Sequence, residues 1–172
     1  MASSACITML SVSSLALTLA AGGAAAQSLT PPFNSYAAKF SCGTATVDAD
    51  VVKGTYATSI NIHNPQSKTS VAFFKKVVTA PEEGQGPGKI VVLSGPNLDV
   101  LTPDQAQQVD CPLIVKALQA SGHIEGFVVI EVAPQPAGTT TPPALDVVGK
   151  YTARAGASGF DVVVYSPKLI TR

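Results

Sequence analysis

The sequence has 172 residues with 11 Lys and Arg and 11 Asp and Glu, so its formal net charge at pH 7 is zero. A neutral chain without a basic cluster argues against nucleic acid or an anionic membrane surface as a partner. The chain is 46% hydrophobic, lacks Trp and is rich in Val. Because β-branched residues prefer extended backbone, this composition favours one all-β domain.

The first 26 residues contain no charged residue, unlike the remainder. An apolar run over residues 7–21 precedes three alanines at 24–26, a pattern that signal peptidase cleaves. We therefore expect residues 1–26 to be a signal peptide, Gln27 to begin the mature chain, and the protein to be secreted or periplasmic. No Lys or Arg precedes the run, and a retained membrane anchor is the alternative. After cleavage no membrane span is expected.

Residues 27–35 contain two successive prolines and are predicted to form a flexible leader before a folded domain over residues 36–172. The first strand is expected over residues 36–42, where apolar and polar residues alternate. Residues 43–54 are polar and indicate a loop or a weak strand. An Asp-x-Asp sequence at Asp48 lacks the further oxygen ligands of a calcium site, which favours a solvated loop.

Cys42 and Cys111 are the two cysteines of the predicted mature chain. In an exported protein an even pair is most simply a disulfide. It would close a loop of about 70 residues, worth roughly 4 kcal/mol in the chain-entropy model. Two buried free thiols are the alternative.

Residues 54–78 are predicted to form one β-hairpin. Tyr56, Ile60 and Ile62 share one parity of an alternating pattern, so one face is expected to be buried. The turn falls at residues 64–67, where Asn64 can bond the backbone that follows it. In the second strand two phenylalanines precede two lysines, which predicts a β-bulge near Phe74 or burial on both faces.

The segment over residues 103–110 fits two structures. Thr102, Pro103 and Gln105 match a helical capping box, yet no apolar stripe follows, which favours a turn and a short strand. One amphipathic helix is then expected from Cys111, with Pro112 in its first turn and Gly122 as its end.

Three Val-rich strands are predicted over residues 126–133, 145–154 and 160–166, the last two close enough to form a hairpin. Further short strands precede them, including one over residues 89–94. About seven strands separated by turns are typical of a two-sheet antiparallel β-sandwich, here with one short helix.

Candidate catalytic and ligand residues are few. His63 follows the first hairpin strand, and His123 follows Gly122, and neither lies in a ligand-spaced motif. Glu125 and Glu131 are the carboxylates that a small hydrolase or carbohydrate-active domain would use, together with His123. No catalytic residue, metal ligand or cofactor-binding residue is assigned, and no cofactor is expected.

Four segments resemble a group of uncharacterised exported bacterial β-sandwich proteins: residues 56–65, 109–114, 125–130 and 145–153. The strand order and the Leu-Asp-Val-Val sequence at 145–148 are also similar to the transducers of microbial sensory rhodopsins. The resemblance implies a compact sandwich that acts by association. Those transducers are cytoplasmic, whereas this chain has a predicted export signal, and no functional residue carries over.

The sequence therefore predicts a secreted or periplasmic protein that is not an enzyme and that binds a protein or an envelope component. Association with further copies of the chain is an open alternative. A small hydrolase is the alternative function.

Overall fold

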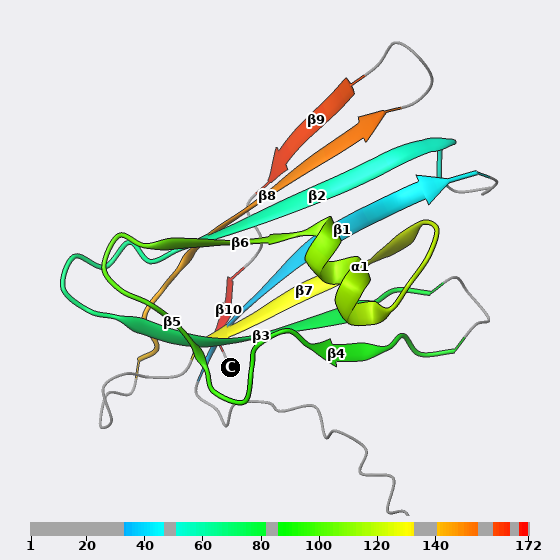
Figure 1. Cartoon of the computed structure of the whole chain (residues 1–172). Helices are drawn as coiled ribbons and strands as arrows, with labels where there is room; N and C mark the ends of the chain where they lie inside the picture. Colours follow the sequence, from blue (N-terminus) through cyan, green and yellow to red (C-terminus); the bar gives the residue numbers. More distant parts are fainter. Residues whose placement is uncertain are drawn as a thin grey trace, which may run out of the picture.

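A computed structural model describes residues 33–46, 51–81, 86–132 and 141–154, together with the backbone of two strands at 160–165 and 169–171 (Figure 1). The predicted signal peptide, most of the predicted leader and the Asp-x-Asp sequence at residues 48–50 lie outside this part of the chain.

The described residues form ten strands and one helix. These are β1 (Asn34–Ala45), β2 (Gly54–His63), β3 (Val71–Thr79), β4 (Ile90–Val92), β5 (Asp99–Leu101), β6 (Ala106–Asp110), α1 (Cys111–Leu118), β7 (Ile124–Val132), β8 (Asp146–Arg154), β9 (Phe160–Tyr165) and β10 (Leu169–Thr171). The prediction of an all-β chain with one short helix is confirmed.

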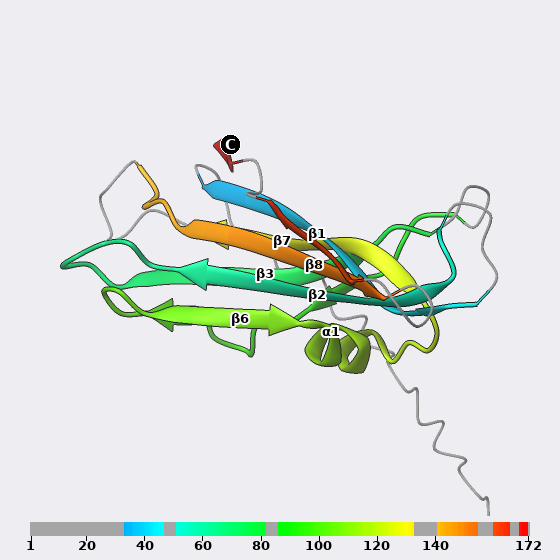
Figure 2. The same ribbon diagram turned by 90° about the horizontal axis from the view of Figure 1, so that it is seen from above.

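All strand pairs are antiparallel, and hydrogen bonds connect them in the order β4-β3-β7-β1-β2-β8-β9 (Figure 1). The short strands β10, β5 and β6 pair with β1, β3 and β2, respectively. β6 and α1 lie together on one side of the molecule (Figure 2). The predicted division into two separate sheets of about seven strands is not confirmed, because β1 joins both halves of this path.

β1 changes its partner along its length. Residues Asn34 to Cys42 pair with β7, whereas Gly43 to Ala45 pair with the start of β2. Just before Gly43, where β1 is no longer in register with β2, the Thr58 side chain of β2 hydrogen-bonds the backbone of Ser41. The Thr58 Oγ1 accepts from the Ser41 amide at 2.9 Å and donates to the Ser41 carbonyl at 2.9 Å. β6 then fills the place beside β2 that β1 has left.

The core lies on the inward faces of both halves, where alternate residues of each strand are buried. Its largest fully buried side chains include Phe40 of β1, Ile60 of β2, Phe73 of β3 and Ile130 of β7. Helix α1 adds Ile114, which is 0% exposed. One core thus takes side chains from both halves of the sheet and from the helix.

The predicted hairpin over residues 54–78 is wrong in its pairing. β2 pairs with β1, β6 and β8, whereas β3 pairs with β4, β5 and β7, so the two strands belong to different halves of the sheet. The alternation that marks each as a strand carries no information about its neighbour.

Asn64 is the residue that fixes the crossing from β2 to β3. Its side chain is 0% exposed, and its amide nitrogen donates to three backbone carbonyls, those of Thr69 at 2.9 Å, Leu101 at 3.0 Å and Thr102 at 3.1 Å. Its Oδ1 accepts from the Gln66 amide at 3.0 Å, as the sequence predicts. Asn64 therefore joins the connection to the segment between β5 and β6.

Burial on both faces, rather than a bulge, accommodates the two phenylalanines of β3. Its register with β7 runs without interruption from Phe73 to Thr79. Phe73 is 0% exposed on the inward face, and Phe74 is 3% exposed on the opposite face.

The turn and short strand favoured for residues 103–110 are confirmed, since β6 covers Ala106–Asp110. Asp110 caps α1, its carboxylate accepting from the Leu113 amide at 3.1 Å, and Pro112 lies in the first turn. The predicted end of the helix is wrong: Gln119, with a φ of 51°, ends it before Gly122. Gly122 instead supplies a second left-handed position, at a φ of 79°.

The predicted hairpin of the last two Val-rich strands is confirmed by the pairing of β8 with β9. Two strands were not predicted, β5 and β10. Each has three residues, too few for alternation to identify.

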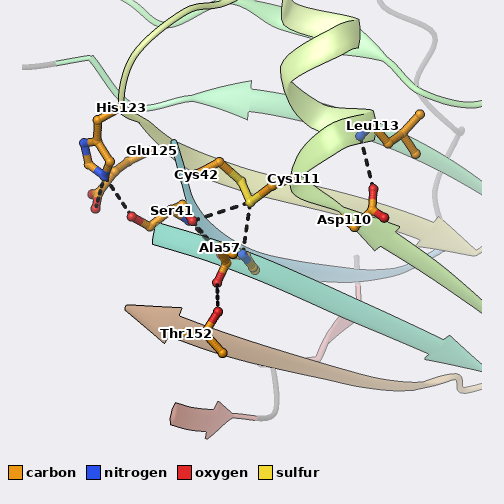
Figure 3. The surroundings of a disulfide bond; sticks show 10 residues. Ser41, Cys42, Ala57, Asp110, Cys111, Leu113, His123, Glu125 and Thr152 are labelled. Carbon is orange, nitrogen blue, oxygen red and sulfur yellow. Dashed lines mark hydrogen bonds and ion pairs between the residues drawn. A yellow bond between two sulfur atoms is a disulfide. The ribbon is translucent and has the colours of Figure 1, made fainter. Parts of the chain in front are cut away.

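The disulfide between Cys42 and Cys111 is present, with a Cα–Cα distance of 5.5 Å (Figure 3). It links β1 to the first residue of α1 at the place where β1 and β2 separate. The Thr58 amide donates to the Cys111 sulfur at 3.0 Å. One covalent bond thus joins the two halves of the sheet beside the helix.

Replacing both cysteines by alanine is expected to lower the free energy of unfolding by about 4 kcal/mol, because the bridge spans 69 residues and restricts the unfolded chain. Urea denaturation of the oxidised protein and of the variant measures the change. Equal midpoints and slopes would contradict a stabilising bridge.

Gly43→Ala is expected to lower the free energy of unfolding by more than about 2 kcal/mol. Gly43 has a φ of 98°, and an added Cβ would lie 1.9 Å from the Gly122 carbonyl oxygen. Gly95→Ala is the matched control, because a Cβ there meets nothing within 4 Å, and a change of at most about 0.5 kcal/mol is expected. Thermal or urea unfolding compares the two, and equal losses would show that the approach of Gly43 to Gly122 is not tight.

Candidate functional site

The structure places the two histidines at opposite ends of the sheet. His63 ends β2, its side chain is 39% exposed, and its Nδ1 lies 3.3 Å from the Asp146 carboxylate, which is itself 64% exposed. His123 precedes β7, and its side chain is 11% exposed. We expect a surface or turn position for both histidines from the sequence, and the structure places His63 at the surface, whereas His123 is largely enclosed.

His123 contacts groups from β1 and β7 (Figure 3). Its Nε2 lies 2.9 Å from the Ser41 hydroxyl and 3.8 Å from the Glu125 carboxylate. The Tyr56 ring of β2 packs against the imidazole, with 5.1 Å between the ring centroids. Three strands therefore hold one imidazole.

Local backbone geometry explains this meeting. Ser41 pairs with Glu125 in the register of β1 and β7, so both residues occupy the same position along neighbouring strands. Gly122 turns the chain into β7 immediately before His123. Lys39, two residues before Ser41 on the same face, places its Nζ 3.2 Å from the second Glu125 oxygen.

The set of serine, histidine and carboxylate differs from a catalytic triad in its connections. In a triad the carboxylate contacts the imidazole nitrogen opposite the one that contacts serine, and so orients the ring. Here Ser41 and Glu125 both approach Nε2. Ser41 as a whole residue is 8% exposed. The arrangement therefore differs from a triad in the nitrogen that the carboxylate approaches.

A hollow of about 790 Å³ opens beside this cluster, and we call it the end hollow. It includes His123 and Glu125 but not Ser41 in its lining. Its walls come from six segments, which are the ends of β1 and β3, the segments before β2 and before β4, the end of α1 with the residues after it, and the start of β7. The lining residues are Thr44, Ala45, Thr46, Val51, Thr79, Ala80, Pro81, Pro87, Gly88, Lys89, Leu118, Ala120, Gly122, His123, Ile124 and Glu125. Both polar and apolar side chains line it.

Glu131 does not join Glu125. The two are six residues apart on β7, which separates them by about 20 Å at about 3.3 Å per residue. The two carboxylates of a glycosidase lie about 5–9.5 Å apart. The Glu131 carboxylate instead accepts a hydrogen bond from the Lys76 Nζ at 2.8 Å, and Glu131 is 3% exposed.

A second enclosed charged pair lies on the inward face of β3. The Lys75 side chain is 3% exposed, and its Nζ lies 3.4 Å from an Asp99 carboxylate oxygen. Burial lowers the pKa of Lys75, and the Asp99 carboxylate opposes this shift. Burial likewise raises the pKa of Tyr36, whose hydroxyl oxygen accepts from the Leu145 amide at 2.7 Å.

Sequence reasoning missed Ser41 and Tyr56 as partners of His123, and Lys39 as a partner of Glu125. Each lies on a strand with ordinary alternation, so no motif marks it. Only the pairing of two predicted strands could have indicated this contact. If the strand at residues 36–42 is paired antiparallel with one that begins near residue 124, Ser41 lies opposite Glu125.

No group of three or more His, Cys, Asp or Glu side chains that could hold a metal ion occurs in the described residues. Among the helices of that same part of the chain, none is long and apolar enough to span a membrane. Comparison of the chain with family models, curated proteins and solved structures finds no match.

His123→Ala is expected to lower the free energy of unfolding by about 1–3 kcal/mol, because the enclosed Ser41 hydroxyl and the Tyr56 ring lose their partner. His63→Ala is the control, since His63 makes an exposed ion pair and is expected to change stability by about 0.5 kcal/mol or less. Urea unfolding at pH 7 measures both. A His123 variant as stable as the His63 variant would argue that the cluster is loosely held.

Proposed function

We propose that this chain is an exported, non-enzymatic β-sandwich protein that binds a protein or an envelope component through the end hollow. The observation that carries the proposal is the hollow itself, where six segments converge at one end of the sheet. Clefts that combine apolar walls with a few polar groups are the usual sites of ligand binding.

The two halves of the sheet are taken as the two layers of a sandwich. Side chains from both halves share one core, as facing layers of a sandwich do. Binding residues on such folds gather on the connections at the ends of the strands, which a rigid scaffold positions. The end hollow also lies among the connections at the ends of the strands.

Export is supported by the uncharged apolar segment over residues 1–26 and by the Cys42–Cys111 disulfide. Disulfides persist in oxidising compartments such as the periplasm and the extracellular space. A periplasmic or secreted protein would meet envelope components and other exported proteins as its partners.

The charge pattern of the cluster favours binding over catalysis. Glu125 is paired with Lys39 and His123, so its charge is compensated within the chain. A general base would instead direct a free lone pair to a substrate. The remaining polar groups of the hollow, including Lys89 and the hydroxyls of Thr44, Thr46 and Thr79, suit hydrogen bonding to a polar ligand.

Capture of partners from a periplasmic extract or culture medium by the immobilised mature chain tests the proposal. Lys89→Glu reverses an exposed charge in the hollow, and several-fold weaker capture is expected. Lys68→Glu is the matched control, because Lys68 is exposed before β3, at the end of that strand remote from the hollow, and capture is expected to be unchanged. No partner and no self-association by light scattering would contradict the binding function.

A small hydrolase is the second candidate, and the observation in its favour is the 2.9 Å contact of the Ser41 hydroxyl with His123. Such an enzyme would turn over simple ester or glycoside substrates, and Ser41→Ala and His123→Ala would each abolish that turnover. Turnover that survives both substitutions, or none in the wild type, would leave binding as the function.

A further inference from the structure

Lys75 has an environment that is rare for a lysine. It lies on the inward face of β3 between Phe73 and Val77, both of which are 0% exposed. Its amine lies 5.6 Å from the centre of the Phe73 ring. Lysine is almost never fully buried unless it is paired, so the group that faces this amine matters.

That group is the Asp99 carboxylate on the neighbouring strand. β5 pairs with β3 in a register that sets Asp99 opposite Phe73, two residues from Lys75. The Lys75 Nζ and the Asp99 Oδ2 are 3.4 Å apart. The Lys75 amine is therefore held within ion-pair distance of the carboxyl group whose carbon it would attack.

Ser94 holds both partners in place. Its hydroxyl donates a hydrogen bond to the Asp99 carboxylate, and its Oγ accepts from the Lys75 backbone amide at 2.9 Å. Ser94 is 7% exposed, so this contact lies largely out of water. A donor on a carboxyl oxygen draws electron density from its carbon and favours attack there.

We propose that Lys75 and Asp99 condense into an intramolecular isopeptide bond that joins β3 covalently to β5. The physical drive is the cost of enclosing the Lys75 charge, which its attraction to the partly exposed Asp99 carboxylate offsets only in part. An amide is neutral and removes both charges. Because the fold already holds the two groups side by side, the reaction avoids the entropy cost of bringing them together from solution.

The reaction is a condensation without a redox change. A proton passes from the ammonium to the carboxylate, which leaves a neutral amine and a carboxylic acid. The amine nitrogen attacks the carboxyl carbon, a Cγ–N bond forms, and a Cγ–O bond breaks. The departing oxygen leaves as water with two of the three ammonium protons, and the third stays on the amide nitrogen. The Asp99 side chain is 25% exposed, which gives this water a route out.

Burial supports the first step, because desolvation lowers the pKa of Lys75 and favours the neutral, nucleophilic amine. In the two other lysine pairs of the described residues, Lys76–Glu131 and Lys39–Glu125, the lysine side chain is more exposed than that of Lys75. Lys76 and Glu131 are closer, at 2.8 Å, but the Lys76 side chain is 15% exposed. Lys39, paired with Glu125, is 52% exposed. Both pairs are therefore internal controls that are expected to remain unlinked.

Intact mass spectrometry of the purified mature chain tests the proposal. After reduction of the disulfide, the wild-type mass is expected to be lower than the sequence mass by one water molecule. Trypsin is expected not to cleave after Lys75 and to yield a branched peptide that contains both Lys75 and Asp99. Asp99→Ala is expected to have its full sequence mass and to be cleaved after Lys75.

Asp99→Asn adds a distinct expectation. An asparagine can form the same amide by releasing ammonia, so the linked variant and the linked wild type would have identical masses. A reduced wild-type protein with its full sequence mass overturns the proposal, whether or not the variants fold. A lost water that maps to Lys76 and Glu131, or to Lys39 and Glu125, overturns it as well.

Discussion

The separation of β1 from β2 is the constraint on which the rest of the structure depends. Up to Cys42 the first strand is a member of one half of the sheet, and from Gly43 onward it pairs with the other half. Backbone groups released at such a point need new partners, because a buried polar group without a hydrogen bond is costly. The Thr58 hydroxyl satisfies both backbone groups of Ser41, and the disulfide lies beside it. The helix, the core and the end hollow all adjoin this junction.

The junction also explains why the His123 cluster lies where it does. β7 begins opposite Cys42, next to the point where β1 turns toward β2. The chain that leaves α1 must pass Gly43 closely to enter β7, and the close approach of Gly43 to the Gly122 carbonyl marks that passage. His123 follows directly and meets Ser41 and Tyr56. The path of the chain from α1 into β7 thus places the His123 imidazole in the lining of the end hollow, where the proposed partner would bind.

β3 is a second place where enclosed polar groups connect neighbouring strands. It carries a charged pair on each face: Lys75 with Asp99 on the inward face, and Lys76 with Glu131 on the other. Each pair joins β3 to a neighbouring strand, β5 in one case and β7 in the other. As long as they remain charged, such pairs contribute little net stability, because desolvation offsets attraction, but either charge left alone would be strongly destabilising. They therefore favour one register of the strands over others. The Glu131 Oε2 has no hydrogen-bond partner among the described residues, so this register is maintained at some cost.

The sequence by itself determined the class of the fold and most of its elements. Alternation with a period of two marks β2, β3, β7 and β8, because successive side chains of a strand face opposite sides. The Asp110 cap with Pro112 marks the start of α1, and the two cysteines of the predicted mature chain indicated the disulfide. These are local or compositional properties, readable from neighbouring residues.

Only the tertiary structure decided which strands pair, and through this pairing it decided the site. β2 and β3 follow one another in sequence yet join different halves, because the buried amide of Asn64 ties their connection to the segment after β5 rather than closing a hairpin. Ser41, Tyr56, His123 and Glu125 come together through register between strands distant in sequence, and Lys75 meets Asp99 in the same way. Alternation shows which face of a strand is buried but not which strand lies beside it, so contacts between strands remain beyond what this one sequence specifies locally.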